Sequence, residues 1–113
     1  MSLNYKRQNL YIENTSIKGI AKINSTPFYV YSYKKIKDNF ENFCKYFKKV
    51  SPLVCFSVKS NSNVSILTEL GKLGSGADVV SEGELLKALK AKINPKKIVF
   101  SGVGKTDSEL RLA

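Results

Sequence analysis

The chain has 113 residues, of which 42% are hydrophobic, an ordinary share for a globular domain or part of a larger one. Its formal net charge is +10, but the lysines are spread along the chain without a zinc-finger, basic-zipper or RNA-binding signature, so a solvated lysine-rich surface is favoured over a nucleic-acid module. Histidine is absent, which excludes Ser-His and Cys-His catalytic pairs and imidazole metal ligands within these residues.

No stretch reaches the roughly 18 to 20 apolar residues that a membrane span needs, and the N-terminus lacks the layout of a signal peptide. We therefore expect a cytoplasmic protein. Cys44 and Cys55 are too few and too irregularly spaced for a metal site, and their apolar surroundings predict two buried thiols.

Residues 1–25 show no clear helical register. Leu10–Glu13 and Ile17–Ala21 are compatible with a strand and a short helix that lead into the following domain. Membership of a separate β domain is an equally open alternative.

From Thr26 onward, short apolar strands alternate with helical patterns. Phe28–Tyr31 is rich in aromatic and β-branched residues and predicts a strand. Ser32 can cap the helix that follows, and Pro52 ends any helical pattern. The apolar stripe expected on this helix consists of Ile36, Phe40, Phe43, Cys44 and Phe47.

The next two strand–helix pairs are predicted at Leu53–Val58 and Ala77–Val80, each strand being followed by a polar run and a helix. Gly74 is placed as the C-terminal cap of the first helix, and Ser81 with Glu84 forms a capping box that opens the second. The stripes expected on the two helices are Ile66, Leu67, Leu70 and Leu73, and Leu86, Leu89 and Ile93.

Lys97–Phe100 is the fourth predicted strand, and a second capping box at Thr106–Glu109 opens a fourth helix. Strand–helix units at this interval predict an α/β fold with a parallel sheet, either doubly wound or an eight-fold barrel. Such a barrel typically needs about 250 residues. Four units would be roughly half of one, so we expect the chain to be truncated relative to the fold it encodes.

Reactive groups in parallel α/β folds gather at the carboxyl ends of the strands. Lys59 follows such a strand, and the alternation of side chains along the strand places it on one face with Ser57 and Cys55. It is a candidate Schiff-base amine, although its position alone favours a lysine that extends into solvent. Asp78 interrupts an apolar strand and would need a partner if buried, for which a lysine of the neighbouring strand would serve, whereas an exposed edge is equally compatible.

Four segments connect these residues to a known family. Val54–Asn61 (VCFSVKSN) resembles the Y-A-V-K-A-N segment of the pyridoxal-phosphate-dependent decarboxylases and racemases built on the alanine-racemase barrel. Gly76–Leu85 (GADVVSEGEL) is similar to the G-x-D-V-V-S-x-G-E-L run of diaminopimelate decarboxylases. Thr26–Tyr31 resembles the first strand of that family, and Ile98–Lys105 follows at the expected interval.

The resemblance covers residues 26–113, and residues 8–25 resemble the segment that joins the family's β domain to its barrel. It implies a lead-in at residues 1–25 and the first four βα units of a (β/α)8 TIM-type barrel at residues 26–113. The family's phosphate loop, stacking histidine and substrate arginines have no match here and are expected after Ala113.

The resemblance carries two residues over as catalytic and cofactor-binding: Lys59, which would hold pyridoxal phosphate as a Schiff base, and Asp78, which would lie beside that lysine and the cofactor ring. Ser81 and Glu84 match positions near the site, although capping suffices to explain them. Asn61 follows the family pattern, and Ser60 replaces its usual alanine. No metal is implied.

The implied activity of the whole enzyme is the decarboxylation of meso-2,6-diaminopimelate to L-lysine, in a homodimer that acts on a small amino acid and engages neither nucleic acid nor membrane. The 113 residues alone are expected to be inactive. The alternatives are a decarboxylase of the same family acting on ornithine, arginine or carboxynorspermidine, a non-enzymatic pyridoxal-phosphate-binding protein and, last, a basic nucleic-acid module.

Overall fold

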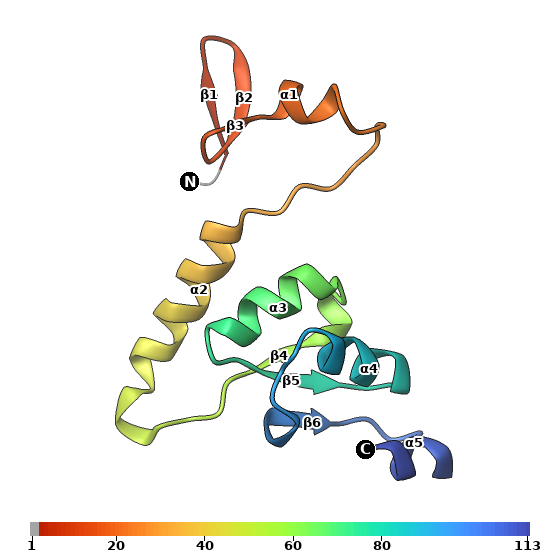
Figure 1. The fold of residues 1–113 in the computed structure, drawn as a ribbon. Coiled ribbons are helices and arrows are strands. Elements are labelled where there is room, and N and C mark those ends of the chain that lie inside the picture. The colour runs from red at the N-terminus through yellow and green to blue at the C-terminus, as the bar shows by residue number, and fades with distance from the viewer. Residues whose placement is uncertain (1–2) are drawn as a thin grey trace. The chain divides into compact units, whose positions relative to one another are not determined.

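The computed structural model describes residues 3–113, and the chain divides into two compact units between Asn39 and Phe40. Figure 1 shows the first unit as a small hairpin sheet with a short helix, and the second as a parallel sheet with its helices. None of the helices within residues 3–113 is long and apolar enough to cross a lipid bilayer.

The first unit is built on an antiparallel sheet of β1 (Leu3–Lys6), β2 (Asn9–Ile12) and β3 (Thr15–Ser16), in that order. A two-residue turn with positive φ at both positions joins β1 to β2, as the right-handed twist of a hairpin requires. Helix α1 (Ile17–Ala21) follows directly. The strand and the short helix predicted in this region are therefore confirmed.

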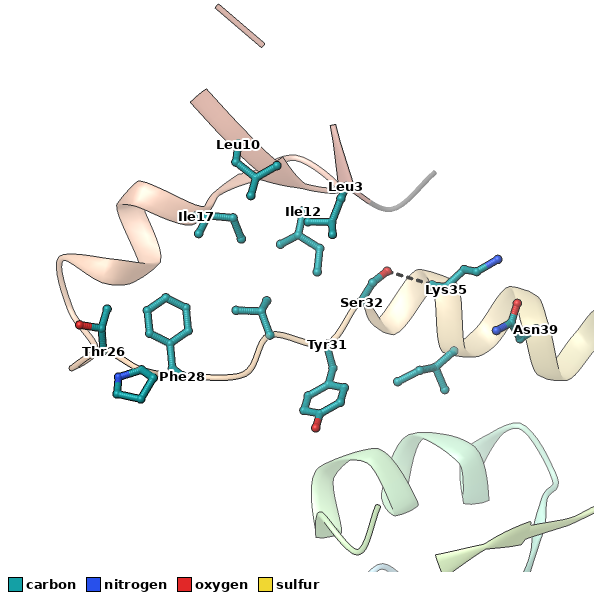
Figure 2. Close-up of a pocket in the computed structure, with 13 residues that line it drawn as sticks. Leu3, Leu10, Ile12, Ile17, Thr26, Phe28, Tyr31, Ser32, Lys35 and Asn39 are labelled. Carbon is teal, nitrogen blue, oxygen red and sulfur yellow. Dashed lines mark hydrogen bonds between the residues drawn. The ribbon is translucent and has the colours of Figure 1, made fainter. Parts of the chain in front are cut away.

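Phe28–Tyr31 is extended but is not a strand, so that prediction is wrong. A strand needs a hydrogen-bonded neighbour, and no backbone partner for this segment exists within residues 3–113. Its apolar side chains instead help to line a cavity of about 610 Å³ in the first unit, together with residues of β1, β2, α1 and the start of α2 (Tyr33–Tyr46). Figure 2 shows Leu10, Ile12 and Ile17 opposite Phe28 across this cavity.

Helix α2 begins as predicted, because the Ser32 hydroxyl accepts a hydrogen bond from the Lys35 N–H at 3.0 Å. A distant residue reinforces this cap. Glu13 adopts a left-handed φ of 54°, and its carboxylate accepts hydrogen bonds from the Ser32 hydroxyl and, at 3.1 Å, from the Lys34 N–H. The start of α2 is thus tied to the end of β2. None of the residues of its apolar stripe is buried.

The second unit contains a parallel sheet of β4 (Cys55–Ser57), β5 (Gly76–Val79) and β6 (Ile98–Phe100), in sequence order. The connections contain α3 (Val64–Lys72) and α4 (Glu82–Lys90), and the strand order confirms the three predicted parallel strands after Pro52. The remaining elements are α5 (Asp107–Leu112) and the short 3-10 turns Lys48–Val50, Val58–Ser60 and Pro95–Lys97.

The core of this unit lies between one face of the sheet and the helices α3 and α4. Leu67 of α3 and Ala88 of α4 are fully buried in it. Leu86 and Leu89 are 48% and 38% exposed, so their assignment to the buried stripe is wrong, whereas Ile93 is buried as predicted. The face of α4 that packs inward instead carries Leu85 and Ala88, and the small alanine suits a close approach of helix and sheet. The other core members are Val58, Ala77, Val79 and Ala91.

The predicted cap at the end of α3 is confirmed. Gly74 has a φ of +94° and donates its N–H to the Gly71 carbonyl at 2.9 Å, while Ser75 donates to the Leu70 carbonyl at 3.1 Å. These two bonds form a Schellman-type ending, in which the left-handed position favours glycine.

The two capping boxes differ. At α5, Thr106 and Glu109 make both reciprocal bonds. At α4, the Ser81 hydroxyl accepts from the Glu84 N–H at 3.3 Å, but the Glu84 carboxylate accepts from the Val80 N–H, one residue before the cap. The Glu109 carboxylate also accepts from the Glu82 N–H at 3.2 Å, so that one side chain contacts the first turns of both α4 and α5.

Glu109 is expected to make a pH-dependent contribution to stability. The backbone N–H of Thr106, then the Thr106 hydroxyl and the Glu82 N–H, hold the pKa of Glu109 below its ordinary value of 4.5. A lowered pKa stabilises the folded state above the unfolded pKa, and this contribution is lost as the pH falls through the folded pKa. Glu109→Gln should therefore lower the thermal midpoint slightly at pH 7, and the difference from the parent should vanish toward pH 3.

The matched control is Glu82→Gln, because the Glu82 carboxylate makes no hydrogen bond within residues 3–113. Thermal scans of the parent and both variants between pH 7 and 3 provide the measurement. A Glu109→Gln deficit that does not change with pH would contradict this account.

Candidate functional site

The predicted site residues Lys59 and Asp78 lie at the carboxyl ends of β4 and β5, where parallel α/β proteins place their chemistry, and Ser101 occupies the same position after β6. Lys59 follows β4, Asp78 lies near the end of β5, and Ser101 follows β6. They belong to three neighbouring strands of one sheet. Figure 1 shows these strands side by side in the second unit.

Lys59 follows the strand, as predicted, but it lies on the 3-10 turn Val58–Ser60 and does not continue the strand face of Cys55 and Ser57. β4 ends at Ser57, and a turn bond from the Asn61 N–H to the Val58 carbonyl at 3.0 Å replaces the strand ladder. Val58 is fully buried and anchors the turn, whereas the Lys59 side chain is exposed. Within residues 3–113 the Lys59 amine has neither a hydrogen bond nor an ion pair, so it is available to a ligand.

Asp78 is half-buried, and its carboxylate accepts two hydroxyl hydrogen bonds. Ser101 donates to Oδ1 at 2.5 Å, and Ser57 donates to Oδ2 at 3.4 Å. The expected partner was a lysine of the neighbouring strand, but no ion pair joins Asp78 to Lys59 within the part of the chain that the structure describes. Two serines satisfy the carboxylate instead, because the register places Ser57 opposite Asp78 in β4 and β5.

Sequence reasoning did not identify Ser57 and Ser101 as partners of Asp78. One signal was present. Each is a polar residue at the carboxyl end of an apolar strand, the position at which Lys59 and Asp78 had been selected. What the sequence lacked was the order and register of the strands, which bring both hydroxyls to one carboxylate.

Cys55 lies on the same face of the sheet, two residues before Ser57. Burial, and secondarily the negative charge of Asp78, raise the pKa of the Cys55 thiol above its ordinary value of 9.0. The thiol therefore stays protonated at neutral pH and is not an activated nucleophile. Cys44 and Cys55 are both half-buried, which corrects the prediction that both are buried.

The remaining residues near the site have local structural roles. Ser81 and Glu84 make the bonds at the start of α4 described above, and Asn61 accepts a hydrogen bond from the Asn63 N–H at 3.0 Å. Within residues 3–113 no group of three or more acidic, histidine or cysteine side chains is arranged to hold a metal ion. The cavity of the first unit is lined by none of the site residues.

Comparisons with known proteins agree on one family. Residues 33–113 match the family model described as pyridoxal-dependent decarboxylase, pyridoxal binding domain. A diaminopimelate decarboxylase of Aquifex aeolicus is 48% identical over 96% of this chain, and one of Helicobacter pylori strain J99 is 56% identical over 78%. The crystal structure of diaminopimelate decarboxylase from M. jannaschii in co-complex with L-lysine has a TM-score of 0.88 and 35% identity, covering 98% of this chain.

These relatives are much longer than this chain. The matched region is 25% of the Aquifex protein, 22% of the Helicobacter protein and 27% of the M. jannaschii chain. The chain therefore spans about a quarter of the length of the relatives it matches.

Proposed function

The chain belongs to the family of pyridoxal-dependent decarboxylases, and on this basis we propose that the whole protein decarboxylates meso-2,6-diaminopimelate to L-lysine. The observation that carries the proposal is the identity of 48% and 56% to relatives named diaminopimelate decarboxylase. Lys59 and Asp78, at the carboxyl ends of adjacent strands, supply an amine and a carboxylate where such chemistry is expected.

The residues present fit pyridoxal phosphate. Its aldehyde requires an accessible amine, and Lys59 is exposed on a turn whose backbone is held by the buried Val58. We propose that Lys59 holds the cofactor and that Asp78 lies beside it. When bound, the cofactor supplies an electron sink for the electron pair left by a departing carboxylate. The polar face formed by Ser57, Asp78 and Ser101 orients the reacting groups, while the apolar face of the sheet packs against the helices.

Other decarboxylases of the family, acting on ornithine, arginine or carboxynorspermidine, are the alternative. The Asp78–Leu85 run (DVVSEGEL) favours diaminopimelate. A non-enzymatic pyridoxal-phosphate-binding protein ranks below both, because residues 8–25 resemble the junction to a β domain.

Further parts of the proposal concern organisation. We propose residues 1–25 as the lead-in and residues 26–113 as the first part of the (β/α)8 barrel, in a cytoplasmic homodimer. The 113 residues alone are proposed to be inactive, because three paired parallel strands are far short of an eight-stranded barrel.

The test is an assay of carbon dioxide release by the full-length protein loaded with pyridoxal phosphate. Carboxyl-labelled meso-diaminopimelate, ornithine and arginine are supplied in parallel at equal concentration. We expect kcat/KM to be highest for diaminopimelate, with L-lysine as the product. Preferential turnover of ornithine or arginine would show that this amino acid, and not diaminopimelate, is the substrate. No turnover of any of the three by folded, cofactor-loaded protein would refute the proposal.

A further inference from the structure

Both carboxylate oxygens of Asp78 are occupied by hydroxyls that come from the strands on either side. We propose that Ser57 and Ser101 are positioning residues that compete with Lys59 for the Asp78 carboxylate and so keep the Lys59 amine free of an ion pair. This inference rests on the proposed function, in which that amine holds the cofactor.

The two hydroxyls are located by the sheet itself. Ser57 is opposite Asp78 in the β4–β5 register. Ser101 follows β6, and its N–H donates to the Val79 carbonyl at 2.9 Å, which extends the β5–β6 ladder by one residue. Each donor is therefore fixed by backbone hydrogen bonds, so the carboxylate lies between two hydroxyls held in place.

Lys59 lies two residues after Ser57, on the 3-10 turn, so the two Cα atoms are separated by less than the roughly 6 to 7 Å of an extended chain. The four-carbon stem of a lysine can span such a distance. An ion pair with Asp78 would hold the amine in its charged, unreactive form, because an opposite charge favours the protonated state of an amine. The structure shows the other arrangement, with the carboxylate on the serines and the amine exposed.

The remaining charged groups around Asp78 do not offer an equivalent partner. On β4 the nearest titratable group is the Cys55 thiol, whose pKa is raised and which is therefore neutral. β6 (Ile98–Phe100) has no charged residue. Beyond its end, the Lys105 amine donates to the Gly102 carbonyl at 2.6 Å. At the start of α4, the Glu84 carboxylate is bound to the Val80 N–H. Lys59 is left as the cation that the serines keep from Asp78.

The experiment measures the reactivity of Lys59 in the full-length protein without cofactor. Trace acetylation with acetic anhydride at pH 8, followed by peptide mass spectrometry, compares the labelling of Lys59 with that of the exposed Lys90 in the same sample. In the double variant Ser57→Ala/Ser101→Ala, Asp78 is released and pairs with Lys59. We expect the relative labelling of Lys59 to fall by about two- to tenfold, the range for an amine gaining an opposite charge near a protein surface.

Rescue separates competition from packing. Adding Asp78→Asn to the double variant removes the charge and should restore the labelling of Lys59, which a purely structural role of the serines does not predict. Ser60→Ala is the matched control, because its hydroxyl bonds to the Ser57 carbonyl at 2.7 Å and not to Asp78, so labelling should be unchanged.

Unchanged labelling in the double variant, or a loss that Asp78→Asn does not restore, would overturn the inference. Each single serine variant should give part of the effect, which keeps the test decisive if the double variant folds poorly. Because no cofactor or substrate is added, the result is independent of which amino acid the protein decarboxylates. Failure of the carbon dioxide assay is thereby distinguishable from failure of this inference.

Discussion

Lys59→Ala in the full-length protein is expected to abolish covalent attachment of pyridoxal phosphate and to lower kcat/KM for decarboxylation by at least about a thousandfold. The effect is large because the amine nitrogen is a reacting atom, and no residue adjacent to Lys59 in the chain carries a second amine. Between Val58 and Ser62 the only amine-bearing side chain is that of Lys59. The measurement is incubation with the cofactor, reduction with borohydride and mapping of the modified peptide, together with the carbon dioxide assay.

Two further variants make this result specific. Lys59→Arg keeps a positive charge but removes the primary amine, so it should fail as completely as alanine. Lys90→Ala removes an exposed lysine of α4 and should retain both label and activity. Label on a lysine other than Lys59 in the parent protein, or retained label in Lys59→Ala, would show that the cofactor is anchored elsewhere.

Gly76→Ala is expected to destabilise the protein by about 3 kcal/mol, the upper end of the usual cost of overpacking. A Cβ at this position would lie 2.3 Å from the Lys97 carbonyl oxygen and 2.7 Å from the Cys55 sulfur. The first of these contacts is to backbone, which cannot move without disturbing the approach to β6. Gly76 is itself buried at the start of β5. The measurement is the thermal and urea unfolding midpoint of the full-length protein.

Gly83→Ala provides the matched control. A Cβ at Gly83 would meet nothing within 4 Å, and the residue lies in the first turn of α4. Alanine has the higher helix propensity, so this variant should be neutral or more stable by up to about 1 kcal/mol. Equal midpoints for Gly76→Ala and the parent would mean that β5 and β6 separate at little cost. The first glycine of the G-x-D-V-V-S run is thus explained by strand packing, before any role in chemistry.

The local features of this protein could be predicted from its sequence because their causes lie within a few residues. Ser32 caps α2, Gly74 ends α3 and the Thr106–Glu109 box opens α5, and each effect acts between neighbours along the chain. The alternation of short apolar runs with helical patterns likewise predicted the parallel sheet of the second unit. The resemblance of VCFSVKSN to a family segment is what selected Lys59.

Other features depended on which distant segments meet. Phe28–Tyr31 has the composition of a strand but finds no hydrogen-bonded neighbour within residues 3–113, so it lines a cavity instead. In α4, two overlapping apolar stripes were compatible with the sequence, and only packing against the sheet selected Leu85 and Ala88 over Leu86 and Leu89.

The environment of Asp78 also depends on which distant segments of the chain meet. The sequence by itself determined that a carboxylate interrupts an apolar strand and that a lysine ends its neighbour. Only the tertiary structure decided that the carboxylate binds Ser57 and Ser101, which lie 21 and 23 residues away along the chain. The physical reason is that the two-residue alternation of side chains shows which residues share a face of one strand. Strand order and register, which the packing of the whole sheet sets, determine which residues on that face become neighbours.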